Sequence, residues 1–270
     1  MTVLDSSFLW EVRKIIQHMY NHGWDERNGG NLSYLLSQDE VNQYFSNSTV
    51  IRTLPIGFDA KPLIGKVFVV TGTGKYFKNV YDDPENNLGI IRINESGNEA
   101  EVLWGFKDGG KFTSELPAHL MSHISRLKVD PFHRVVMHCH PSNILAMTFV
   151  HDLDEREFTR TLWKMCTECI VVFPEGVSIL PWMLCGTNSI GEATALKMEE
   201  SRIVIWSQHG IYGVGRTIDE TFGLIETVEK AAEIYIKIMN TEIKNTISDE
   251  QLIELANYFK VDYRKDYLGN

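Results

Sequence analysis

The segment RVVMHCH at positions 134–140 constrains the fold more strongly than any other stretch of the chain. Its apolar run before His138 predicts a buried β-strand. Side chains two positions apart share a face of a strand, at about 6.5–7 Å along the chain. His138 and His140 therefore point the same way, and Cys139 faces the opposite side as a small core residue. A strand that ends with two imidazoles on one face indicates a site at that end.

A metal ion is the ligand that this histidine pair suits best. Two imidazoles can bind one cation at about 2.0–2.1 Å each, and a catalytic zinc site uses three protein ligands and one open position. His209 is the candidate third ligand, because it follows the apolar run RIVIW and precedes Gly210 at another strand end. The alternative is that each histidine is satisfied by hydrogen bonds in the core or at the surface. The shared strand-end position favours zinc.

Two other patterns resemble metal sites but lack essential residues. His119 and His123 are four apart on a predicted helix, yet the residues between them include no glutamate, which the H-E-x-x-H pattern requires as a base. Helical packing or an exposed face is the preferred interpretation. Cys166 and Cys169 form a C-x-x-C without a second such pair, so they are interpreted as structural.

Strand and helix patterns alternate along the chain and predict an α/β fold. The sequence indicates a single domain over residues 1–270, with a central mixed, largely antiparallel sheet flanked by helices on both faces. Residues 37–65 are expected to be a long irregular excursion. Strands are predicted at LSYLL, KVFVVTG, GIIRI, EVLWG, RVVMHCH, CIVVFP, RIVIW and IYGVG, and helices over 7–22, 114–127, 142–150, 154–165, 189–200 and 217–240.

Charge and composition narrow the class of partner. The net charge of −10 argues against nucleic acid or an anionic membrane surface, but a few backbone amides and a metal still allow an anionic substrate. The chain has no apolar window of the length of a membrane span, and its first residues lack a secretory pattern. Its four cysteines are too few for a disulfide framework. We therefore expect a soluble, cytoplasmic protein.

Three short segments offer backbone amides and hydroxyls to an anion: NGGN at 28–31, TGTGK at 71–75 and TSE at 113–115. Glycine permits close approach to a ligand, and a helix start favours phosphate. Each segment alone is also explained as a turn, a helix terminator or a cap. Glu115 begins a predicted helix, where it can either reach a metal near the phosphate or complement the helix dipole.

Taken together, these segments resemble the class II aldolase and adducin family. The resemblance is carried by GWDERNGGNLS (23–33), VTGTGKYFKNV (70–80), TSELPAHLMSH (113–123), VVMHCH (135–140), TECIVVFPEGVSILPWM (167–183) and HGIYGVGRTIDETFGLIET (209–227). These segments run through most of the chain in order. The 37–65 excursion is similar to that of one subgroup and longer than in fuculose phosphate aldolases and ribulose phosphate epimerases.

The resemblance implies roles for individual residues. His138, His140 and His209 match the zinc ligands of the family, and Glu115 matches its catalytic glutamate. Glu168 matches a second acidic residue that acts across a subunit boundary. The family's phosphate-binding region is matched by Asn28, Gly30, Asn31, Thr73, Gly74, Thr113 and Ser114.

The resemblance also implies a reaction and an assembly. The reaction is zinc-dependent, reversible cleavage of L-rhamnulose 1-phosphate to dihydroxyacetone phosphate and L-lactaldehyde, with one Zn²⁺ per subunit. The assembly is a homotetramer with active sites at subunit interfaces. The alternatives are fuculose-1-phosphate cleavage, ribulose-phosphate 4-epimerisation, and a non-catalytic, adducin-like oligomerising module.

Overall fold

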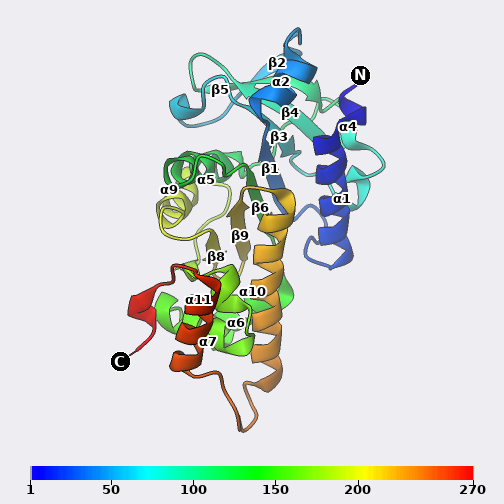
Figure 1. The fold of residues 1–270 in the computed structure, drawn as a ribbon. Helices are drawn as coiled ribbons and strands as arrows, with labels where there is room; N and C mark the ends of the chain where they lie inside the picture. Colours follow the sequence, from blue (N-terminus) through cyan, green and yellow to red (C-terminus); the bar gives the residue numbers. More distant parts are fainter. Residues whose placement is uncertain (1, 270) are drawn as a thin grey trace.

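The computed structural model describes residues 2–269, which form one domain around a nine-stranded sheet (Figure 1). The strand order is β2-β5-β4-β3-β1-β6-β9-β8-β7, and among these strands only β7 and β8 pair in parallel. The predicted mixed, largely antiparallel sheet is therefore confirmed. The strands are β1 (Asn31–Leu35), β2 (Arg52–Pro55), β3 (Val67–Thr71), β4 (Leu88–Ile93), β5 (Glu99–Gly105), β6 (Val135–Cys139), β7 (Ser178–Leu180), β8 (Ile203–Trp206) and β9 (Gly210–Gly215).

Helices cover both faces of the sheet, as predicted. Along β6, Val135, Met137 and Cys139 pack into the core shared with α1, α6, α7 and α10, whereas Val136 packs on the face covered by α5 and α9. Figure 1 shows α5 and α9 together on one side, with α1 and α10 on the other. The main helices are α1 (Ser7–Asn21), α5 (Leu116–Val129), α6 (Ser142–Val150), α7 (Glu155–Met165), α9 (Asn188–Lys197), α10 (Ile218–Ile238) and α11 (Asp249–Phe259).

Local sequence signals explain where α10 begins. The Thr217 hydroxyl accepts a hydrogen bond from the backbone N–H of Glu220 at 3.1 Å, so the capping residue satisfies one of the unpaired donors of the first turn. The apolar stripe of α10, which includes Ile225 and Val228, is fully buried against the sheet. This burial holds the helix along β6 and β9, beside the predicted histidine site.

Two predictions about local structure were wrong. The segment CIVVFP does not form a strand; it contains the short helix α8 (Cys169–Val172), whose backbone is satisfied by local bonds such as Val172 N–H to Glu168 O at 2.9 Å. The 37–65 excursion is not irregular throughout. It contains the helix α2 (Gln38–Phe45) and the edge strand β2, which pairs with β5. The short helices α3 (Phe77–Val80) and α4 (Pro84–Asn87) complete the fold.

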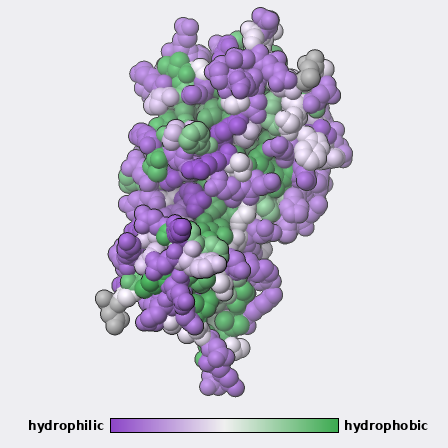
Figure 2. Space-filling model, in the orientation of Figure 1, coloured by the Kyte–Doolittle hydropathy of each residue, from purple (hydrophilic) through white to green (hydrophobic). Residues whose placement is uncertain are grey.

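The face of the molecule drawn in Figure 2 is mostly hydrophilic, with hydrophobic patches between the hydrophilic areas. None of the helices within residues 2–269 has the length and apolar character needed to cross a membrane.

Candidate metal centre and active site

Strand pairing brings the predicted functional segments together at one end of the neighbouring central strands β3, β1, β6 and β9. Because β1 runs antiparallel to both β3 and β6, its start lies beside their ends: Asn31 pairs with His138, and the N–H of Leu32 donates to Oγ1 of Thr71 at 3.1 Å. Because β9 also runs antiparallel to β6, His209, one residue before β9, lies beside the end of β6. Residues far apart in the sequence therefore meet at one place.

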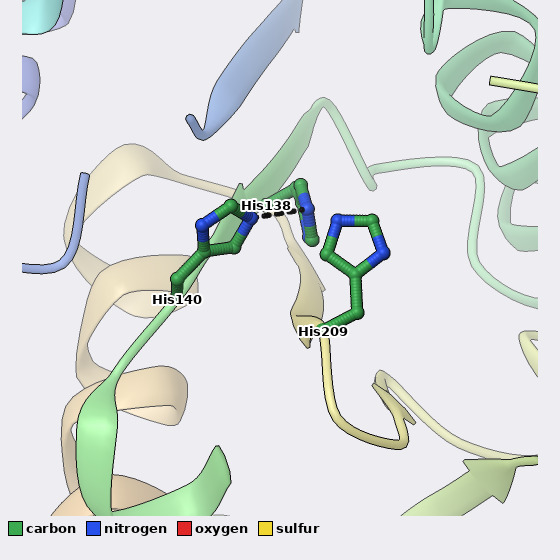
Figure 3. Close-up of side chains that lie close together, drawn as sticks. All are labelled: His138, His140 and His209. Carbon is green, nitrogen blue, oxygen red and sulfur yellow. Dashed lines mark hydrogen bonds between the residues drawn. The ribbon is translucent and has the colours of Figure 1, made fainter. Parts of the chain in front are cut away.

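The three predicted ligands face a common point (Figure 3). Nε2 of His138 and Nε2 of His140 are 3.2 Å apart. The ring centroids of His138, His140 and His209 are separated by 5.0, 5.0 and 5.1 Å, and their ligand nitrogens all lie within 4.8 Å of one another. The structure thus gathers the three histidines as a metal site requires.

The hydrogen bonds behind these rings show that the site fits a cation. Nδ1 of His138 donates to the carbonyl of Ile211 at 3.1 Å, and Nδ1 of His140 donates to the Glu26 carboxylate at 2.9 Å. In the neutral form each ring carries one proton, here on Nδ1, so both Nε2 atoms then expose lone pairs to each other. Facing lone pairs repel unless a cation lies between them. Two nitrogens bound to one tetrahedral zinc are about 3.3–3.4 Å apart, close to the spacing seen here.

Burial keeps the rings of His138 and His209 in the form that binds metal. It lowers the pKa of His138 well below its usual range, with a further decrease from the neighbouring His140 and His209. Burial, followed by the proximity of His140, lowers the pKa of His209 to about 4. Neutral imidazole is the ligating form, so these two rings need not lose a proton near pH 7 to bind a divalent cation.

Glu115 lies beside the triad and is buried. Its Oε2 accepts hydrogen bonds from Nδ2 of Asn31 at 2.8 Å and from the hydroxyl of Tyr212 at 3.0 Å. Oε2 is also 3.6 Å from Nε2 of His138, and Oε1 is 3.9 Å from Nε2 of His209. Burial raises the pKa of Glu115, and the two hydrogen bonds partly oppose that change. A carboxyl group with a raised pKa next to a metal centre is suited to proton transfer.

The three predicted phosphate segments border the same site. The N–H of Thr113 donates to the Thr71 carbonyl at 2.9 Å, and the N–H of Thr73 donates to the Lys111 carbonyl at 2.9 Å, which joins two of the segments. The third packs against the metal centre, since a Cβ at Gly29 would lie 2.9 Å from Cε1 of His140. A Cβ at Gly30 would lie 1.8 Å from Oδ1 of Asp25, so only glycine fits there.

The side chains of these segments differ in how free they are. Asn28, Gly74 and Ser114 are exposed, and Thr73 is half-buried. Asn31 is buried, and both ends of its side-chain amide are already bonded within the protein, to Glu115 and to His119. The Asn31 side chain is therefore a hydrogen-bond partner of Glu115 in this structure.

Glu168 lies away from this group. It is exposed at the start of α8, where its carboxylate accepts a hydrogen bond from the Cys166 thiol at 2.8 Å, a contact that lowers the pKa of Glu168. Its hydrogen bonds within residues 2–269 are local ones. An action of Glu168 at the site would therefore come from a neighbouring subunit.

The two patterns set aside in the sequence have other contacts in the structure. His119 and His123 are both fully buried and bind the same hydroxyl, Oγ of Ser33, at 2.8 and 2.9 Å. They belong to the packing between α5 and β1. Cys166 and Cys169 flank the start of α8, and neither joins a metal-binding group in the described part of the chain.

Sequence reasoning missed three residues of the site. Tyr212 stands opposite His138 in the strand register, Glu26 binds the outer nitrogen of His140, and Cys185 lies within 4.8 Å of ligand atoms of Glu115 and His209. Only the strand register could have revealed Tyr212. A cavity of about 550 Å³ opens from the centre and is lined by residues that include Glu26, His140, Cys185 and His209. This volume suits a small-molecule substrate.

An α/β fold that presents a histidine triad, a buried carboxyl group and glycine-rich turns at the ends of its central strands defines a metal-dependent enzyme. The chain belongs to the class II aldolase and adducin family: the family model described as "Class II Aldolase and Adducin N-terminal domain" matches residues 11–236. It is a class II, metal-dependent aldolase, and therefore a carbon–carbon lyase.

Relatives named rhamnulose-1-phosphate aldolase match almost the whole chain. The protein from Listeria monocytogenes serotype 4b (strain CLIP80459) is 58% identical over 99% of this chain and 98% of its own length. Those from Enterococcus faecalis and Mannheimia succiniciproducens are 56% and 44% identical, over 99% and 96% of this chain and 96% of their own lengths.

Solved structures show the same fold. A sugar-phosphate aldolase from Thermotoga maritima superposes with a TM-score of 0.75 at 27% identity, covering 88% of this chain and 97% of that one. An L-fuculose 1-phosphate aldolase has a TM-score of 0.63 at 19% identity, covering 94% and 97%, a likeness that concerns the fold alone.

Proposed function

We propose that this chain catalyses the zinc-dependent, reversible cleavage of L-rhamnulose 1-phosphate to dihydroxyacetone phosphate and L-lactaldehyde. The observation that carries the proposal is the convergence of the three histidines beside the buried carboxyl of Glu115. The substrate is supported by relatives named rhamnulose-1-phosphate aldolase, which match nearly the full chain.

In this proposal His138, His140 and His209 hold the cation. When bound, the cation supplies Lewis-acid stabilisation of the negative charge that develops on the substrate oxygens as the C3–C4 bond breaks. Glu115 delivers a proton to C3 during cleavage and takes it back during condensation. Its burial near the triad keeps bulk water away from that proton.

The second proton transfer balances the reaction. The C4 hydroxyl loses its proton as C4 becomes the aldehyde carbon of L-lactaldehyde, and the electron pair of the broken bond stays with C3. We assign the acceptance of the C4 proton to Glu168 of a neighbouring subunit, directly or through water. The exposure of Glu168 and its lowered pKa are consistent with an ionised carboxylate at a surface that a neighbour can reach.

The phosphate end of the substrate is assigned to the turns that border the centre. The exposed or half-buried residues Asn28, Gly30, Thr73, Gly74 and Ser114, together with the buried Thr113, are assigned to supply backbone amides or hydroxyls there. Asn31 is the remaining residue of the predicted set. We assign its side chain the role of a hydrogen-bond donor to Glu115 rather than to the phosphate. Positioning by the phosphate converts binding energy into alignment of C3 with Glu115.

We further propose a cytoplasmic homotetramer with its sites between subunits. Trp182 and Leu184 line the cavity beside the metal centre, yet their exposed fractions are 67% and 64%. Large apolar side chains left in water around a site are typical of an interaction surface. A neighbouring subunit would cover them and bring its Glu168 towards the cavity.

A substrate assay tests the proposal. Purified protein loaded with one equivalent of zinc is incubated separately with L-rhamnulose 1-phosphate, L-fuculose 1-phosphate and L-ribulose 5-phosphate. We expect dihydroxyacetone phosphate to form fastest from the first, and removal of the metal to abolish it. Isomerised sugar phosphate without triose phosphate would identify an epimerase instead. No turnover of any of the three by fully metallated protein would contradict the proposal and favour an adducin-like module.

A further inference from the structure

A row of buried polar side chains runs from Glu115 into the core between β1 and α5. Asn31 donates to Oε2 of Glu115 at 2.8 Å, and the Asn31 carbonyl oxygen is bonded to Nε2 of His119. Nδ1 of His119 lies 2.8 Å from Oγ of Ser33, and that oxygen lies 2.9 Å from Nε2 of His123. Ser33, His119 and His123 are 1%, 0% and 0% exposed, so water cannot replace these bonds.

Only one direction of donation satisfies the whole row. The carbonyl oxygen of Asn31 can only accept, so Nε2 of His119 carries the proton. Burial lowers the pKa of His119 to about 3, which leaves the ring neutral near pH 7 with Nδ1 as an acceptor. The Ser33 hydroxyl must then donate to His119 and accept from Nε2–H of His123. Nδ1 of His123 has no hydrogen-bond partner in the described chain, as expected for the bare nitrogen at the far end.

This direction determines how Glu115 is held. Because His119 occupies the oxygen of Asn31, the NH₂ group of Asn31 is turned towards Oε2 of Glu115, which also accepts from Tyr212 at 3.0 Å. Oε1 of Glu115 accepts no hydrogen bond from the residues described and lies 3.9 Å from Nε2 of His209. Oε2 also lies close to the metal centre, 3.6 Å from Nε2 of His138, but two donors hold it. The two oxygens of the carboxylate therefore differ: Oε2 is anchored by hydrogen bonds, and Oε1 is free to carry a proton.

We propose that Ser33, His119 and His123 are positioning residues that hold Asn31 so that Oε1 of Glu115, and not Oε2, transfers the proton. The inference rests on the proposed function, because it gives the row a role in the proton transfer assigned to Glu115. These residues contact no substrate; they act through Asn31.

Replacement of Ser33 tests the role in turnover. Ser33→Ala removes the hydroxyl that joins the two rings and frees His119 and Asn31 to turn. We expect kcat per bound metal ion to fall about tenfold, the size of one buried hydrogen bond, with KM within twofold. Counting turnover per bound metal prevents partial unfolding from imitating the effect. Ser33→Thr keeps the hydroxyl and is expected to restore kcat.

Ser122→Ala is the matched control. Ser122 lies on α5 beside His123, is 0% exposed, and its Oγ has no hydrogen-bond partner in the described chain, so the same atom is removed without breaking the row. We expect Ser122→Ala to keep the wild-type kcat. Normal kcat in Ser33→Ala would overturn the proposal, and so would equal losses in Ser33→Ala and Ser122→Ala.

A second measurement does not depend on turnover. Long-range ¹H–¹⁵N spectra of the wild-type protein labelled with ¹⁵N-histidine report which ring nitrogen carries the proton. We expect His119 and His123 to be neutral and protonated at Nε2 at pH 7, with His123→Gln used to assign the signals. A proton on Nδ1 of either ring would contradict the proposed direction of hydrogen bonding along the row. If the wild type cleaves no sugar phosphate, the proposed function fails while these spectra still decide the direction of the row.

Discussion

The hydroxyl of Tyr212 donates a hydrogen bond to Oε2 of Glu115 at 3.0 Å, from the position directly opposite His138 in the β6–β9 register. The Tyr212 ring also stacks on the His138 ring, with centroids 4.4 Å apart and an interplanar angle of 22°. One side chain therefore contacts both the proposed proton carrier and a proposed metal ligand. The pairing of β6 with β9 therefore fixes the position of Tyr212, which binds Glu115, relative to His138.

Tyr212→Phe isolates the contribution of that hydroxyl. The substitution keeps the stacked ring but leaves Glu115 with one anchoring donor, so its carboxylate is oriented less well. We expect kcat to fall about tenfold while zinc remains bound in a one-to-one ratio. Steady-state kinetics and metal analysis measure both. Tyr34→Phe is the control, since the Tyr34 hydroxyl binds Glu40 at 3.4 Å, outside the site; an unchanged kcat in Tyr212→Phe would contradict the anchoring role.

Glu26 is expected to tune the affinity for the cation. Its carboxylate accepts from Nδ1 of His140 at 2.9 Å, which fixes the tautomer and orients Nε2 towards the cation. Because the Glu26 side chain is 68% exposed, we expect Glu26→Gln to weaken cation binding by about tenfold, the lower end for such partners, with near-normal kcat at saturating metal. Competition with a chromogenic chelator gives the dissociation constant. Exposed Glu254 provides the control Glu254→Gln, and equal affinities in all three proteins would rule out this role.

The buried histidines predict a pH dependence of stability. In the unfolded chain His123 titrates near 6.5, whereas burial lowers its pKa in the folded protein to about 3. Between these values the unfolded chain binds a proton that the folded protein does not, so stability is lost as pH falls from 6.5 towards 3, by about 1.4 kcal/mol per pH unit for each such ring.

His123→Gln should remove the contribution of His123 to the pH dependence of the unfolding free energy. Between pH 7 and pH 5, the variant should lose about 2 kcal/mol less unfolding free energy than the wild type. Urea unfolding of the metal-free proteins at both pH values measures the difference. Parallel losses in the two proteins would show that His123 does not titrate on unfolding in this window.

A shared active site predicts complementation between subunits. Glu115→Ala and Glu168→Ala should each lower turnover by two or more orders of magnitude, because each removes one proton transfer. In mixed tetramers some sites combine an intact Glu115 with an intact Glu168 of the neighbour, and part of the activity should return. Assemblies of verified mixed composition that stay inactive would place Glu168 outside the reaction.

The strands that carry the site could be predicted from sequence because their side chains alternate or are uniformly apolar. His138, His140 and His209 stand at strand ends, where a local pattern identifies them without knowledge of strand order. The role of Tyr212 could not be predicted, since it depends on pairing with a strand more than 70 residues away in sequence. The hydrogen bond from Asn31 to Glu115 could not be predicted either, because it depends on where α5 begins relative to β1.

The wrong predictions have a common physical origin. The segment Cys169–Val172 is rich in β-branched residues, but tertiary context gives it a helical turn. Strand β2 has a polar and mixed sequence, and it exists because β5 offers an edge to pair with. In both cases the structure depends on residues far away in sequence, and a local sequence pattern does not contain that information.

The account depends most on three imidazoles that share one cation. Anomalous diffraction at the zinc absorption edge, from crystals of protein loaded with one equivalent of zinc, tests this directly. We expect one peak per chain, at about 2.0–2.1 Å from Nε2 of His138, His140 and His209. A peak held by other residues, or one that His209 does not contact, would contradict the account.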